Sequence, residues 1–155
     1  MRVAVLSDTH GILRPEVAQA LEGCDCILHG GDIGNESIML ELQRKAPVYA
    51  VRGNNDTGPW AAGLAKELTV SLGGYRFYMV HSQKDRTAEL EGADFFIFGH
   101  SHQYMSEKRG DTLWLNPGSC GRRRFKLPLT FVLLELTEEG YGLQRCEIQE
   151  NKGEV

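Results

Sequence analysis

Residues 94–102 read Asp-Phe-Phe-Ile-Phe-Gly-His-Ser-His, an apolar run that ends in a glycine and two histidines. The run predicts a short strand buried on both faces, and the glycine predicts a turn at its carboxyl end. Residues two apart point the same way in an extended backbone, so His100 and His102 are expected to converge. Imidazole is the commonest side-chain ligand for transition metals. A single His-x-His pair is more typical of a solvated turn, so its meaning depends on the rest of the chain.

Four other segments repeat this plan of an apolar run followed by residues of metal-ligand type. The runs occupy residues 3–7, 26–31, 48–53 and 77–80. The ligand types that follow them are Asp8, His10, Asp32, Asn54 and His81. Singly, each has an ordinary structural explanation as a helix cap, a turn residue or a hydrogen-bonded core histidine. Because ligands bind beyond the carboxyl ends of strands in open α/β sheets, the five segments together predict one metal site.

The pattern of apolar residues and turns predicts one α/β domain over residues 1–155, with a parallel first half and antiparallel hairpins in the second. Helices are expected from Pro15 to Gly23 and over 36–45, the second capped by Asn35. They alternate with strands, so the first three strands should be parallel with right-handed crossovers. Two sheets should pack face to face, and the polar tail 150–155 is expected to fray. The expected strands are 2–7, 25–29, 48–52, 67–72, 75–80, 94–98, 104–108, 112–115, 129–136 and 141–148.

Composition narrows the class of protein. The chain has 155 residues and a formal net charge of −4, which argues against non-specific nucleic-acid binding. It does not exclude a small phosphorylated substrate held by a few arginines. No apolar stretch has the length of a signal-peptide core or a membrane span, so we expect a cytoplasmic protein without a membrane partner. The four cysteines are then expected to be free thiols.

The predicted ligands supply only nitrogen and oxygen. That set favours Mn, Fe, Zn or Ni over Cu(I) or an iron–sulfur cluster, and Mn is our first expectation. A carboxylate at Asp32 has two oxygens and can bridge two cations. Two divalent ions about 3.5–4 Å apart suit phosphoester hydrolysis, because they generate a hydroxide near neutral pH and stabilise the attacking and leaving oxygens.

The ordered motifs resemble those of the calcineurin-like metallophosphoesterase superfamily. The short chain and the Asn116–Ser119 segment look like its small bacterial and archaeal phosphodiesterase branch. The resemblance implies a two-sheet αββα sandwich and a dinuclear centre bridged by Asp32. It assigns one metal to Asp8, His10, Asp32 and His102, and the other to Asp32, Asn54, His81 and His100. The matching motifs are Asp8-x-His10, Gly31-Asp32, Gly53-Asn54-x-Asp56, His81 and Gly99-His100-x-His102.

The resemblance implies a metal-dependent phosphodiesterase, with a metal-activated hydroxide as the nucleophile. A phosphomonoesterase on the same site is one alternative. A catalytically silent scaffold is the other, since the superfamily includes a retromer subunit that uses this fold for protein binding. The small branch often forms dimers or larger assemblies, so a homo-oligomer is also possible.

The sequence departs from the superfamily at Asn55. Many members carry His there, and the small branch often has Cys. Asn can donate a hydrogen bond to phosphate but cannot act as a general acid near neutral pH, which favours diesters. Asp56 is expected to orient Asn54 or Asn55 and so assist catalysis.

Three further features are predicted near the site with alternatives left open. The Asn116–Ser119 segment is either an ordinary type II turn or a turn that lines the site. Arg122, Arg123 and Arg124 form either a solvated basic run or a phosphate contact, with Arg124 as our choice. His29 is expected to support the site without binding metal.

Overall fold

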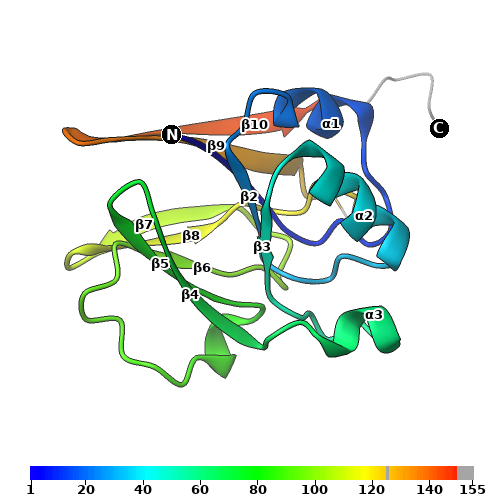
Figure 1. The fold of residues 1–155 in the computed structure, drawn as a ribbon, viewed down its shortest axis with the longest axis horizontal. Coiled ribbons are helices and arrows are strands. Elements are labelled where there is room, and N and C mark those ends of the chain that lie inside the picture. The colour runs from blue at the N-terminus through cyan, green and yellow to red at the C-terminus, as the bar shows by residue number, and fades with distance from the viewer. Residues whose placement is uncertain (125, 150–155) are drawn as a thin grey trace.

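A computed structural model of the chain describes residues 1–124 and 126–149, and the expected fraying of 150–155 lies outside them. The strands form two five-stranded sheets packed face to face (Figure 1). The first sheet has the order β10-β9-β1-β2-β3, and the second has the order β4-β5-β6-β8-β7. The predicted two-sheet α/β sandwich is therefore confirmed.

The first sheet contains the predicted parallel unit. β1 (Arg2–Leu6), β2 (Cys26–His29) and β3 (Val48–Ala50) pair in parallel. The last hairpin, β9 (Leu129–Thr137) and β10 (Gly140–Ile148), extends the same sheet antiparallel to β1. β1 is thus the central strand of this sheet, with β9 from late in the chain on one side and β2 from early in the chain on the other.

Two helices cover the outer face of this sheet. α2 (Glu36–Lys45) has the predicted bounds, whereas α1 (Pro15–Leu21) begins at the predicted residue and ends two residues before Gly23. The Asn35 side chain caps α2 by accepting a hydrogen bond from the Ile38 amide at 3.0 Å. The apolar faces of the helices pack against the outward residues of β1 and β2, in a cluster that includes Ala4, Leu6, Val17, Leu21, Ile27, Ile38 and Leu42.

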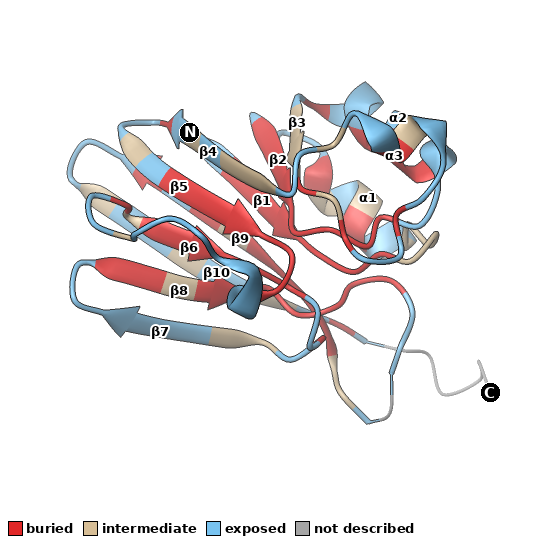
Figure 2. Ribbon diagram, turned by 90° about the horizontal axis from the view of Figure 1, so that it is seen from below, coloured by how far each residue is buried: buried red, intermediate tan, exposed pale blue. Residues whose placement is uncertain are grey.

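The main core lies between the two sheets. Alternation along β1 turns Val3 and Val5 inward, where they join a cluster with Phe77 and Phe95 of the other sheet. The Phe77 and Phe95 rings stack with centroids 4.5 Å apart. Figure 2 shows the buried residues concentrated in the central strands of both sheets, whereas β7 is largely exposed.

The second sheet contains the predicted antiparallel hairpins together with one parallel strand, so it is mixed. Its hairpins β4 (Glu67–Leu72) with β5 (Tyr75–Val80), and β7 (Met105–Arg109) with β8 (Thr112–Asn116), are as predicted. β6 (Phe95–Ile97) pairs in parallel with both β5 and β8. The connection from β5 to β6 is long enough to cross back over the sheet, and β6 pairs with β8 only after β7 has intervened in the chain. Neither parallel pairing therefore leaves a local turn signal.

The outer face of the second sheet is not covered by a helix in the described part of the chain. It is packed instead by Leu90 and Ala93 of the connection before β6, beside Phe96 and Trp114. The only regular element that the structure describes in that connection is the 3-10 turn η1 (Gln83–Asp85). The short helix α3 (Pro59–Ala62) was not anticipated either. Among the described residues, no helix is long and apolar enough to cross a membrane.

The carboxyl ends of β1, β2, β5 and β6 meet at one edge of the sandwich. Within the first sheet, the Asp8 amide donates to the Gly31 carbonyl at 2.9 Å. Within the second sheet, the Gly99 amide donates to the His81 carbonyl at 2.8 Å. Between the sheets, the His100 amide donates to Asp8 Oδ2 at 3.1 Å. These bonds hold the exit loops of both sheets against one another.

Replacing Phe95 by Ala should remove a fully buried ring from the core between the sheets. We expect the free energy of unfolding to fall by about 3–5 kcal/mol, because the cavity cannot fully collapse. Urea denaturation followed by circular dichroism measures the change. Leu40→Ala, on the exposed side of α2, is the control and should change stability by no more than about 0.5 kcal/mol. Similar losses for the two variants would contradict this placement of the core.

Candidate metal centre

The backbone is strained at the predicted ligands. Five non-glycine residues in the described chain have positive φ, between 48° and 74°. This conformation costs about 1–3 kcal/mol per residue and persists only where the surroundings enforce it, typically at functional sites. All five are predicted metal ligands: Asp8, His10, Asp32, His100 and His102.

Asp8 is fully buried, and its two carboxylate oxygens have different surroundings. Oδ2 accepts hydrogen bonds from Ser7 Oγ at 2.6 Å and from the His100 amide at 3.1 Å. Oδ1 has no hydrogen-bond partner. It lies 3.6 Å from His10 Nε2 and 3.3 Å from His102 Nε2. The side chain is therefore fixed through one oxygen while the other faces two imidazoles.

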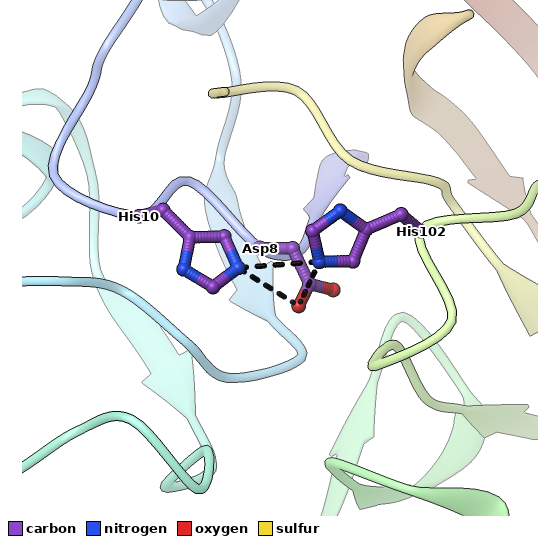
Figure 3. A group of neighbouring side chains, drawn as sticks. All are labelled: Asp8, His10 and His102. Atoms are coloured by element: carbon purple, nitrogen blue, oxygen red, sulfur yellow. Dashed lines mark hydrogen bonds and ion pairs between the residues drawn. The ribbon is translucent and has the colours of Figure 1, made fainter. Parts of the chain in front are cut away.

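Figure 3 shows His10 and His102 reaching Asp8 from two different loops. Their Nε2 atoms are 3.2 Å apart. Two imidazole nitrogens and an unpartnered carboxylate oxygen thus converge on one small volume. A divalent cation at their common focus satisfies all three lone pairs, so this donor set fits a metal ion.

Asp32 connects this group to a second one. Its Oδ2 lies 3.6 Å from His10 Nε2 and 3.2 Å from His81 Nε2. Asn55 holds the carboxylate, donating its amide to Oδ1 at 2.9 Å and its Nδ2 to Oδ2 at 3.1 Å. One oxygen therefore faces a histidine from each side of the site. Asp8, Asp32 and His81 form the second group of potential ligands.

The tautomer of His81 follows from its hydrogen bond. Nδ1 must carry a proton, because it donates to the Gly30 carbonyl at 2.7 Å. The buried Nε2 has no hydrogen-bond partner although it faces Asp32. A carbonyl acceptor behind a ligating imidazole is the usual arrangement in metal sites, since it orients the ring and exposes the other nitrogen.

His100 and Asn54 stand at the edge of the site. Both are exposed, and both line a cleft of about 800 Å³ together with His81. The ring centroids of His100 and His81 are 5.2 Å apart. The structure thus brings Asp8, His10, Asp32, His81 and His102 into close contact and places the other two predicted ligands beside His81.

Asp56 supports two loops of the site through their backbone. Its buried carboxylate accepts hydrogen bonds from the backbone amides of Asp32 at 2.9 Å, Gly34 at 3.1 Å and Gly53 at 2.9 Å. It therefore fixes the loop that carries Asp32 and the loop that carries Asn54 and Asn55.

The Asn116–Ser119 turn braces the site from the other sheet. Asn116 Nδ2 donates to the Gly99 carbonyl at 3.1 Å and to Ser101 Oγ at 3.2 Å. Ser119 Oγ donates to the Asp8 carbonyl at 2.9 Å. These contacts hold the histidine loop and the Asp8 loop in place. Sequence reasoning left this role open because it depends on partners far away in the chain.

His29 is a fully buried neutral histidine behind the site. Its Nδ1 accepts from the Gly31 amide at 3.0 Å, so Nε2 carries the proton and donates to Thr9 Oγ1 at 3.0 Å. Thr9 Oγ1 in turn donates to the Ile33 carbonyl at 2.8 Å. Burial lowers the pKa of His29 to about 4. It supports the loops around Asp32, as the sequence analysis expected.

Electrostatics keep the acids of the site ionised. Burial alone would raise the pKa of Asp8, but the nearby imidazoles of His10 and His102 outweigh it and hold that pKa far below its usual range. The pKa of Asp32 is lowered against burial by His81 and the Asn55 amide. The Asp8 carboxylate, in turn, raises the pKa of His10. Two buried carboxylates whose pKa values are lowered stay negatively charged, and they therefore attract cations.

Asp8→Asn should weaken Mn²⁺ binding by about 100-fold, because it removes the charge that faces both His10 and His102. Titration calorimetry on protein freed of metal by chelation measures the affinity. Asp111→Asn, in the exposed turn between β7 and β8, removes the same charge away from the site and should leave the affinity unchanged. Equal affinities for Asp8→Asn and the unaltered protein would rule out this cation position.

His29 should make the metal-free protein less stable in acid. Between about pH 6.5 and pH 4 the unfolded chain binds a proton at this residue and the folded chain does not, so stability falls as pH falls. The expected loss by pH 4 is about 3 kcal/mol. Urea unfolding at several pH values in chelator should give a shallower pH slope for His29→Gln. Parallel slopes for the two proteins would refute the buried neutral state.

Comparison with known proteins agrees with the site. The model of the calcineurin-like phosphoesterase superfamily domain matches residues 1–139. A probable metallophosphoesterase of Methanothermobacter thermautotrophicus is 34% identical, covering 86% of this chain and 85% of the relative. A phosphodiesterase of Methanocaldococcus jannaschii is 27% identical, covering 77% of this chain and 84% of the relative.

Solved structures show the same fold. An archaeal phosphodiesterase superposes with a TM-score of 0.76 and 21% identity, covering 96% of this chain and all of its own. Vps29 of Chaetomium thermophilum superposes with a TM-score of 0.75 and 16% identity, covering 97% of this chain and 98% of its own. With the family model spanning nearly the whole chain, this protein belongs to the calcineurin-like phosphoesterase superfamily.

Proposed function

We propose that this chain is a metal-dependent phosphodiesterase with two cations that share Asp32. The observation that carries the proposal is the position of Asp32 Oδ2, 3.6 Å from His10 Nε2 and 3.2 Å from His81 Nε2. One carboxylate oxygen between two histidine groups is what a bridging ligand requires. Relatives named as phosphodiesterases support the reaction class.

Unpartnered buried atoms support the presence of cations. Asp8 Oδ1 and His81 Nε2 are buried without a hydrogen bond, and Asp8 belongs to both groups of potential ligands. We assign Asp8, His10, Asp32 and His102 to one cation, and Asp32, Asn54, His81 and His100 to the other. Two nitrogen-and-oxygen sites favour Mn, with Fe, Zn or Ni as alternatives. Cations held there would activate water near neutral pH and offset the charge on the phosphoryl oxygens.

Asn55 is the proposed substrate-binding and catalytic side chain of the protein itself. In the structure its Nδ2 donates to Asp32 Oδ2, so it already lies at the shared carboxylate. Its exposed amide can donate a hydrogen bond to a phosphoryl oxygen but holds no proton that it can release to a leaving group near neutral pH. This favours diesters whose leaving alcohol is acidic. Asp56 contributes by positioning, since it fixes the loop that carries Asn55.

The cleft beside the second group accommodates one arm of a small phosphate ester. It holds about 800 Å³ and is lined by charges of both signs, which gives it no strong preference for an anionic or a cationic group. The charged lining residues are Arg52, Lys66, Lys84, Glu67 and Asp85, with Asp56 behind them.

Two other functions remain as outcomes of the test. A phosphomonoesterase would use the same cations, and only Asn55 separates the two enzymes. A silent scaffold is the second, because the likeness to Vps29 concerns the fold alone. The convergence of five ligand side chains, four of them on strained backbone, favours a working site over a scaffold.

Hydrolysis of bis-p-nitrophenyl phosphate and of p-nitrophenyl phosphate should be compared after chelation, with and without added Mn²⁺. We expect diester cleavage that requires the metal, exceeds monoester cleavage, and falls by about 1,000-fold or more in Asp32→Ala. Asp111→Asn is the charge-matched control and should retain full activity. Circular dichroism and a urea titration establish that Asp32→Ala is folded.

The outcomes separate the alternatives. A preference for the monoester would replace the phosphodiesterase by a phosphatase. Metal binding with no cleavage of either ester would contradict the proposal for simple diesters. No metal binding and no cleavage would favour the scaffold.

A further inference from the structure

A second cleft opens on the other side of the site. It holds about 350 Å³ and is lined by His10, His102 and the three consecutive arginines Arg122, Arg123 and Arg124. The arginines are exposed and belong to the connection between β8 and β9. Its cationic lining residues therefore stand beside two of the metal-site histidines.

This arginine segment is held firmly against the site at its start. The Cys120 amide donates to the Ser7 carbonyl at 3.4 Å, and Arg14 Nε donates to the Gly121 carbonyl at 2.7 Å. A side chain at Gly121 would collide with the Thr9 backbone, so the two segments are in close contact. The arginines begin at the next residue, and their place beside the Asp8–His10 loop is a consequence of these contacts.

The charged residues that line this cleft, within the described part of the chain, are basic. Three guanidinium groups line it, and no carboxylate is among its described lining residues. The chain as a whole carries a net charge of −4, so the positive charge of this cleft is opposite in sign to that of the whole protein. The larger cleft on the other side has lysine and arginine balanced by Glu67 and Asp85. The two clefts therefore differ in what they attract.

Each cleft is lined by one of the two histidines that face Asp32. His10 lines the arginine cleft and His81 lines the larger one, and both face Asp32 Oδ2. A phosphodiester centred there has two ester arms that leave the phosphorus in different directions. One arm can enter the mixed-charge cleft while the other enters the arginine cleft.

We propose that the arginine cleft binds a second anionic group on one arm of the substrate, most simply a second phosphate. The substrate class is then a small phosphodiester that carries a further phosphate away from the bond that is cleaved. This inference rests on the proposed phosphodiesterase function. Guanidinium groups bind phosphate through paired, charge-assisted hydrogen bonds, which gives both affinity and orientation. Arg124 then contacts this distal phosphate and not the one being hydrolysed.

Two matched substrates test the inference. Thymidine 5′-(p-nitrophenyl phosphate) and its 3′-phosphorylated form release the same p-nitrophenolate and differ only in the distal phosphate. With Mn²⁺ present, we expect the 3′-phosphate to lower KM by about tenfold with little change in kcat. The advantage should vanish in the triple variant Arg122→Gln, Arg123→Gln, Arg124→Gln, while cleavage of the unphosphorylated form persists.

A control variant removes the same charge elsewhere. Arg44→Gln, Lys108→Gln and Arg145→Gln replace three exposed basic residues that lie outside both clefts, and this triple variant should keep the tenfold advantage. Equal KM values for the two substrates in the unaltered protein would overturn the inference. So would an advantage that survives in the arginine triple variant or disappears in the control.

A binding measurement separates this inference from the proposed function. Titration calorimetry of Mn²⁺-loaded protein compares thymidine 3′,5′-bisphosphate with thymidine 5′-monophosphate. Tighter binding of the bisphosphate that depends on the three arginines supports the subsite even if neither ester is cleaved, in which case only the phosphodiesterase fails. Cleavage of both esters with no preference for the bisphosphate retains the phosphodiesterase and rejects the subsite.

Discussion

The structure depends on a cluster of buried carboxylate oxygens and histidine nitrogens that is energetically costly to bring together. Asp8 and Asp32 are almost completely buried, and three histidine nitrogens face their oxygens. Removing two carboxylates from water without full hydrogen bonding is costly, and Asp8 Oδ1 has no partner. The same environment favours a cation strongly. The surrounding loops hold these groups together despite the cost. Five residues in these loops have left-handed backbone conformations, and buried hydrogen bonds from backbone amides fix the same carboxylates.

Much of the fold and the side chains that converge at the site could be predicted because those signals are local. Apolar runs of strand length followed by Asp or His indicate these side chains, and Gly73-Gly74 indicates the hairpin between β4 and β5. The parallel pairing of β6, the hydrogen bonds of Asp56 and the arginine cleft could not be predicted. Each depends on segments that are distant in the chain, and local spacing carries no information about them.

The positive φ angles were also missed, for a related reason. Left-handed backbone is expected of glycine, yet here it occurs at Asp and His residues. Only the packing around the site compels it. Asp56 on one side and Asn116 on the other fix the loops in which these residues lie. Residue type thus indicates which side chains could bind a metal. The hydrogen bonds that fix their loops in the required conformation can be recognised only in the three-dimensional structure.

The central position of β1 bears on how the protein is made. β1 lies between β2, which follows it closely, and β9, which begins at Leu129. The loop after β1 also receives the His100 amide, 92 residues later in the chain. A ribosome must therefore release most of the chain before the first strand has both neighbours. The acidic loop likewise has no histidine partners from the second sheet until His81, His100 and His102 have emerged, so an early nascent chain lacks several of the side chains that converge at the site.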